Sequence, residues 1–162
     1  MQAEKNNGDI SPAIRAATAE HGQKPYAVVV ACSDSRVVPE DIFMTGIGEL
    51  FVIRIPGNVI GTTQLAAVEY GVEHLGCSVV VVLGHKQCGA VGATIAGGAE
   101  GFVKTITDGI HKAIGEEKDD YKASCLNVNY GVRVLRSKIH KEGDFAVVGA
   151  IYDVKDGHVD WL

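Results

Sequence analysis

Two short polar motifs hold the side chains most suited to chemistry in this chain. Segment 32–36 reads Cys-Ser-Asp-Ser-Arg, and segment 84–89 reads Gly-His-Lys-Gln-Cys-Gly. The thiolates of Cys32 and Cys88 and the imidazole of His85 suit zinc, which prefers sulfur and nitrogen donors in a tetrahedron. Three protein ligands leave a fourth position for water, which is typical of catalytic rather than structural zinc sites. We therefore expect one Zn²⁺ per chain.

Asp34 and Arg36 lie two positions apart, so in an extended segment their side chains share one side. A carboxylate paired with a guanidinium stays ionised and keeps a fixed direction. Asp34 can thus accept a hydrogen bond from a zinc-bound hydroxide and orient it for attack, or swing in as a fourth zinc ligand and block the water. Plainer interpretations stay open on spacing alone, because Cys32 can be a core thiol and an Asp–Arg pair is often only a surface pair.

Both motifs directly follow apolar segments that are typical of strands buried on both faces of a parallel sheet. Strands are expected at residues 26–32, 50–53, 78–83 and 144–152, with a short edge strand at 157–161. Helices are expected at residues 11–20, 61–75, 88–96, 104–114 and 121–140. This alternation indicates an α/β fold with a mostly parallel sheet. Ligands of such sheets bind beyond the carboxyl ends of the strands, so the two motifs are expected to meet there.

Composition and glycine spacing exclude several classes of function. A formal net charge of −5 argues against nucleic-acid binding, which needs a basic face. The longest apolar runs fall far short of the roughly 20 residues that span a bilayer, and the N-terminus has no signal-peptide character, so we expect a cytoplasmic protein without membrane contact. Segment 84–89 begins like a phosphate-binding loop, but Ala90 and Val91 follow it where such a loop has a lysine and a serine or threonine, which argues against a nucleotide site. We expect an N-terminal arm with a short helix at 1–22 and a single catalytic domain at 23–162.

The two motifs, each placed after a strand, resemble those of the β-class carbonic anhydrases. The resemblance runs from about residue 23 to residue 161 and includes segments 48–54, 57–58 and 150–153. It implies a parallel sheet of strand order 2-1-3-4 flanked by helices. It also implies a zinc lyase, a carbonate dehydratase, that converts carbon dioxide reversibly to bicarbonate and a proton. The implied zinc ligands are Cys32, His85 and Cys88, and the implied catalytic dyad is Asp34 with Arg36.

The same resemblance assigns four further residues to substrate binding. Gln23 matches a glutamine that reaches into the partner subunit's site, Phe51 and Tyr70 match aromatic pocket residues, and the Gly89 N–H matches a donor to the substrate. Without the resemblance, Gln23 is a polar residue before a strand, Phe51 a core aromatic and Tyr70 a helix residue that faces the core. The family also implies a homodimer with active sites at its interface, often paired into a homotetramer.

Other functions remain open at this stage. Relatives on the same scaffold hydrolyse carbonyl sulfide or carbon disulfide, and Pro56 stands where the family more often has a small residue, which can alter the pocket. A non-catalytic zinc-binding protein would have no need of the pair formed by Asp34 and Arg36. A redox protein would use Cys32 and Cys88 as a dithiol, and tight zinc without a functional disulfide would exclude it.

Overall fold

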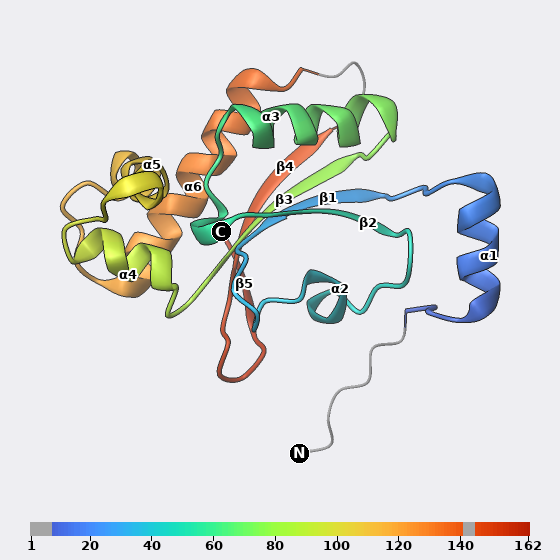
Figure 1. Cartoon of the computed structure of the whole chain (residues 1–162), viewed down its shortest axis with the longest axis horizontal. Coiled ribbons are helices and arrows are strands. Elements are labelled where there is room, and N and C mark those ends of the chain that lie inside the picture. Colours follow the sequence, from blue (N-terminus) through green and yellow to red (C-terminus); the bar gives the residue numbers. More distant parts are fainter. Residues whose placement is uncertain (1–7, 141–144) are drawn as a thin grey trace.

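A mostly parallel sheet forms the centre of the computed structural model, which describes residues 8–140 and 145–162. Within these residues the sheet has five strands in the order β2-β1-β3-β4-β5 (Figure 1). Their bounds are β1 Ala27–Ala31, β2 Leu50–Arg54, β3 Val79–His85, β4 Ala146–Tyr152 and β5 Val159–Trp161. Strands β1 to β4 pair in parallel, and β5 runs antiparallel to β4 at the edge. The predicted fold class, strand order and edge strand are thus confirmed.

The helices largely follow the sequence expectations. Their bounds are α1 Pro12–His21, α2 Pro39–Ile42, α3 Thr62–Glu69, α4 Gly89–Ile95, α5 Lys104–Ile114 and α6 Asp120–Lys138, with short 3₁₀ turns η1 at Pro56–Asn58 and η3 at Gly101–Val103. Among the described residues, no helix is long and apolar enough to cross a membrane.

Two helical segments differ from the expectations. The helix expected at 61–75 keeps regular α geometry only to Glu69 and then widens into a π-helical turn, η2, at Tyr70–His74. Gly71 in this turn packs so closely on β1 that a Cβ atom would lie 2.5 Å from Cγ2 of Val28. The short helix α2 was not expected, although Pro39 at its first position is a common helix-start signal.

The sheet is buried on both faces because its central strands are continuous runs of valine and alanine. In β1, Val28 and Val30 belong to the core beneath α3 and α6, whereas Val29 and Ala31 belong to the core on the opposite face, which α2 borders. A third apolar cluster, which includes Cys32 and Cys88, joins α4, α5 and α6. These three clusters fix the carboxyl edge of the sheet, where the polar motifs emerge.

Helix α1 contrasts with the rest of the chain because none of its residues is buried. It begins with a hydrogen bond from the Ile14 N–H to the Ser11 hydroxyl and ends at Gly22, whose φ is 78°. Figure 1 shows it standing away from the sheet at the end opposite α4 and α5. Among the described residues, its apolar side chains therefore belong to none of the three core clusters. Of the arm expected before it, residues 1–7 lie outside the described residues.

Two leucines on α6, one buried and one partly exposed, allow the contribution of the core to stability to be tested. Leu135 is fully buried beneath this helix, and Leu135→Ala is expected to lower the free energy of unfolding by about 2–5 kcal/mol, because the lost side chain leaves a cavity. Leu126 on the same helix is 38% exposed, so Leu126→Ala is the matched control, with an expected change of about 0.5 kcal/mol. Urea denaturation measures both changes. Equal changes in the two variants would contradict this account of the core.

Candidate metal centre

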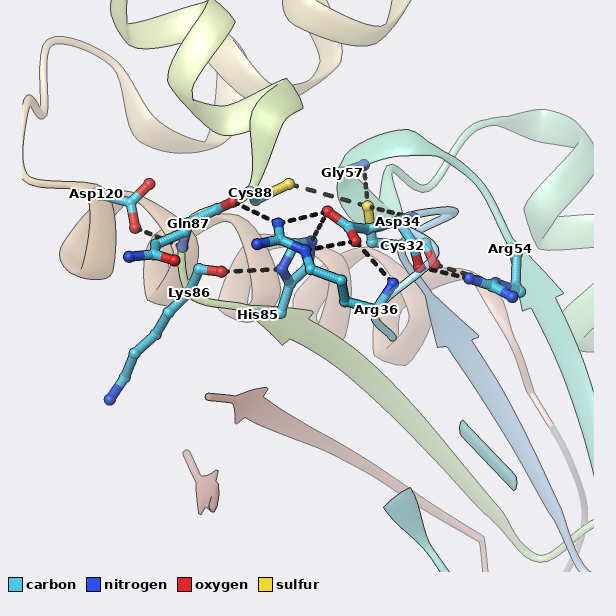
Figure 2. Close-up of polar contacts among 10 residues, drawn as sticks. All are labelled: Cys32, Asp34, Arg36, Arg54, Gly57, His85, Lys86, Gln87, Cys88 and Asp120. Carbon is cyan, nitrogen blue, oxygen red and sulfur yellow. Dashed lines mark hydrogen bonds and ion pairs between the residues drawn. The ribbon is translucent and has the colours of Figure 1, made fainter. Parts of the chain in front are cut away.

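Adjacent parallel strands deliver the two motifs to one place. Strand β1 ends at Ala31 and is followed by Cys32, while β3, its hydrogen-bonded neighbour, ends at His85. The next two residues form a tight turn, in which Gln87 has a φ of 55°, and Cys88 then caps the start of α4. The ligand atoms of Cys32, His85 and Cys88 all lie within 4.8 Å of one another, and the three side chains are buried (Figure 2).

The donor set of this group fits a zinc ion. Nδ1 of His85 lies 2.9 Å from the carbonyl oxygen of Lys86, a contact that assigns the ring proton to Nδ1 and leaves Nε2 with a lone pair. Within the described residues, this buried Nε2 has no hydrogen-bond partner, which is costly in a protein interior. A histidine that donates one N–H to a backbone carbonyl and presents its other nitrogen is the usual arrangement of a metal ligand.

The two cysteine sulfur atoms lie close together, and the hydrogen bonds around Cys32 favour metal binding. Sγ of Cys32 lies 3.9 Å from Sγ of Cys88 and accepts hydrogen bonds from the backbone N–H groups of Asp34, at 3.4 Å, and Gly57, at 3.3 Å. The hydrogen bond from Cys88, followed by the neighbouring His85 side chain and then by these amides, lowers the pKa of Cys32 to about 4 despite burial. The pKa of Cys88 is raised, because its proton is shared with the Cys32 sulfur. The lowered pKa favours the thiolate form of Cys32, which is the form that binds metals.

Asp34 and Arg36 form a two-pronged ion pair at the edge of this group. Nε of Arg36 donates to Oδ1 at 3.0 Å, and Nη2 donates to Oδ2 at 2.8 Å. These bonds hold the pKa of the Asp34 carboxyl well below its usual range. Oδ2 also lies 4.0 Å from Nε2 of His85, so the carboxylate faces Arg36 while remaining beside the metal group (Figure 2).

Four further hydrogen bonds fix the two motifs relative to each other and to the neighbouring elements, and none of them was predicted from the sequence. Arg36 donates from Nη2 to the Gln87 carbonyl at 3.2 Å, which links the first motif to the turn of the second. Arg54 donates to the carbonyls of Cys32, at 3.2 Å, and Asp34, at 2.6 Å. Asp120, at the start of α6, accepts a hydrogen bond from the Gln87 N–H at 2.9 Å (Figure 2).

Of the residues expected to bind substrate, only Gly89 lies beside this group. It directly follows Cys88 and opens α4, and a Cβ atom built there would meet no other atom within 4 Å. The space on the Cα side of Gly89 is therefore open.

Gln23, Phe51 and Tyr70 lie at the other end of the sheet. Phe51 pairs with Val28, four positions before Cys32, a separation of roughly 13 Å along an extended strand. The rings of Phe51 and Tyr70 are 5.9 Å apart, and Gln23 is exposed ahead of β1. Tyr70 is 48% exposed, so the interpretation of this residue as core-facing is wrong.

Comparisons with known proteins agree with this geometry. The carbonic anhydrase family model matches residues 27–159. A carbonic anhydrase of Mycolicibacterium smegmatis is 36% identical, over 90% of this chain and 79% of the relative. Carbonic anhydrase 2 of Mycobacterium tuberculosis is 34% identical, over 84% of this chain and 73% of the relative.

Solved structures extend the agreement to the fold. The β-carbonic anhydrase CafA of Aspergillus fumigatus superposes with a TM-score of 0.85 at 27% identity, over 93% of this chain and 81% of that one. A β-carbonic anhydrase structure from Sordaria macrospora superposes with a TM-score of 0.80 at 28% identity, over 94% of this chain and 87% of that one. The chain therefore belongs to the β-carbonic anhydrase family, the zinc lyases that interconvert carbon dioxide and bicarbonate.

Proposed function

We propose that this chain hydrates carbon dioxide reversibly at one zinc ion held by Cys32, His85 and Cys88. The observation that carries the proposal is the buried Nε2 of His85, which lies beside two cysteine sulfurs and has no hydrogen-bond partner in the part of the chain that the structure describes. When bound, zinc supplies Lewis acidity that lowers the pKa of a water molecule to about 7. Membership of the carbonic anhydrase family supports this substrate.

The remaining polar groups of the site then have distinct roles. Asp34 accepts a hydrogen bond from the reacting water and fixes its direction, because Arg36 keeps the carboxylate ionised and oriented. The N–H of Gly89 stabilises negative charge that develops on the substrate oxygens. The ion pair with Arg36 also holds Asp34 away from the metal position, and the closed arrangement, in which Asp34 becomes a fourth ligand, requires this pair to break.

The test of the function is stopped-flow hydration of carbon dioxide by purified protein at alkaline pH, with zinc measured on the same sample. Fast hydration with about one zinc per chain is the expected result. Hydrolysis of carbonyl sulfide and of carbon disulfide is then assayed under the same conditions. A zinc-loaded protein that hydrolyses either sulfur compound but does not hydrate carbon dioxide would replace this proposal with the alternative substrate.

We further propose that the chain acts as a homodimer or a dimer of dimers. An apolar depression on the sheet has a lining that includes Leu50 and the exposed side chains of Tyr26 and Trp161, and helix α1 has no buried residue. The related structures from Sordaria macrospora are described as tetrameric. Because Gln23 and Phe51 lie far from their own metal group, association would let them complete the partner's site.

A mixing experiment tests this sharing of residues. Gln23→Ala is expected to lower the hydration rate about 100-fold by removing one hydrogen-bond donor to the reacting oxygens. Cys88→Ser lacks a zinc ligand but keeps Gln23. Dissociating and reassociating the two variants together should restore about a quarter of the wild-type rate, because half of the dimers carry one complete site. A rate equal to the sum of the separate variants would show that each chain uses its own Gln23.

Residues 23–162 are proposed as the catalytic domain, with the residues before them forming an arm for association. We propose a cytoplasmic location, because the thiolate ligands Cys32 and Cys88 require reducing surroundings until zinc is bound.

A further inference from the structure

The N–H that Gly57 donates to the Cys32 sulfur comes from a turn that is itself held in place by a distant helix. The turn closes with a hydrogen bond of 3.0 Å from the Asn58 N–H to the Ile55 carbonyl. Gly57 has a φ of 67° and a ψ of 20°, the conformation that the third residue of a type II turn requires. The direction of the Gly57 N–H therefore depends on this turn keeping its conformation and its position.

Asn127 on α6 fixes the position of the turn. Its Nδ2 donates a hydrogen bond of 2.8 Å to the carbonyl oxygen of Gly57, although the two residues are 70 positions apart in sequence. Both residues are buried. Ile110 of α5 packs against the other side of the turn, since a Cβ atom on Gly57 would lie 2.6 Å from its Cδ1. Among the described residues, the hydrogen bond of Asn127 is what ties the turn to α6, so losing it frees the turn to shift.

A shift of the turn would change the hydrogen bond that the Cys32 sulfur accepts. The Gly57 N–H donates to Sγ of Cys32 at 3.3 Å, so moving or rotating the turn lengthens and weakens this hydrogen bond (Figure 2). The bond places the positive end of an N–H dipole on a buried thiolate, where charge is poorly solvated. Hydrogen bonds of this kind to metal ligands commonly change metal affinity 10- to 100-fold.

We propose that Asn127 is a positioning residue of the metal centre, which holds the Gly57 turn so that its N–H stays on the Cys32 sulfur and thereby strengthens zinc binding. The proposal rests on zinc binding at the Cys32 group, but it does not depend on which substrate the site converts.

The first test compares two buried positions one turn apart on α6. Asn127→Leu is nearly isosteric and removes the donor, and zinc should bind about 10-fold more weakly in competition with a chelator. Ser124 is also buried and its hydroxyl has no hydrogen-bond partner in the described residues, so Ser124→Ala is the matched control, with zinc affinity within about 2-fold of wild type. Asn127→Ser serves as a second variant if the leucine variant does not fold. Unchanged zinc affinity in a folded Asn127 variant would overturn the proposal.

An NMR measurement distinguishes a role of Asn127 in positioning the Gly57 N–H from a role in packing alone. In protein loaded with an NMR-active cadmium isotope, a scalar coupling between the metal and the Gly57 amide proton is expected through the N–H···S bond. It should persist in Ser124→Ala and disappear in Asn127→Leu. Absence of the coupling in the wild-type protein overturns the proposal whether or not the variants fold.

Different results would refute the proposed function and the proposed role of Asn127. A protein that shows the coupling but does not hydrate carbon dioxide refutes only the proposed function. A protein that binds neither zinc nor cadmium refutes both.

Discussion

Replacing Cys88 with serine is expected to remove both zinc and activity from a chain that still folds. The hydroxyl group of serine has a far higher pKa than a thiol and is a harder donor, so it does not take the place of a thiolate. The change removes one of the three buried groups that meet within 4.8 Å. Zinc affinity should fall by more than about 100-fold, the upper end of what losing only an indirect partner of a metal costs.

The structure offers a matched control for this experiment. Cys125 is a free, half-buried thiol on α6 that is not part of the metal group, so Cys125→Ser should keep about one zinc per chain and the wild-type rate. Metal content after dialysis against a weak chelator and stopped-flow hydration are measured on both variants. If Cys88→Ser retained its zinc and its rate, the ion would be bound elsewhere and the proposed centre would be wrong.

The sheet was predictable from sequence because its strands are unbroken apolar runs. Segments such as 26–32 and 78–83 are short and rich in valine, which favours strands buried on both faces, and parallel pairing then places Cys32 and His85 at the same edge. The short helix α2 escaped prediction because four residues carry no helical periodicity. The π-helical turn that begins at Tyr70 escaped it because close packing of a glycine on β1, rather than the local sequence, sets its shape.

The hydrogen bonds around the metal group were harder to predict from the sequence than the ligands Cys32, His85 and Cys88 themselves. Arg54 follows a predicted strand that pairs with β1, so the sequence pattern was sufficient to predict that Arg54 lies near Cys32. The hydrogen bonds of Asp120 with Gln87, and of Asn127 with the Gly57 carbonyl, join segments that only the packing of α6 brings together. No local pattern marks such pairs.

The positions of Phe51 and Tyr70 show a second limit of prediction from the sequence. Sequence resemblance assigned Phe51 and Tyr70 to a substrate pocket, and the register of β2 then showed that they lie far from Cys32 of the same chain. A sequence gives the motif but not which subunit's site the motif serves. That choice depends on how two chains associate, which is why mixing variants is more informative for these residues than single substitutions.

Replacing Asp34 with asparagine is expected to slow carbon dioxide hydration by about 10²- to 10⁴-fold without loss of zinc. Asparagine keeps the size of the side chain but removes the charge, and its NH₂ group cannot accept a hydrogen bond from the Arg36 guanidinium. Asp34 is not a member of the metal group, so about one zinc per chain should remain. Asp153, which pairs with Lys86 at 2.7 Å, is the matched control, because Asp153→Asn also breaks a carboxylate–cation pair.

The pH dependence of this variant distinguishes the two roles considered for Asp34. Arg36 holds the pKa of the Asp34 carboxyl well below its usual range, so the group is ionised throughout the range from about pH 5 to 9. If Asp34 only orients the reacting water, the ratio of wild-type to variant rates should stay constant across this range. If Asp34 instead closes onto the metal as pH falls, the wild type loses activity there and the variant does not, so the ratio would fall toward one. Rate profiles of both proteins, with zinc content measured at each pH, decide between a fixed dyad and one that opens.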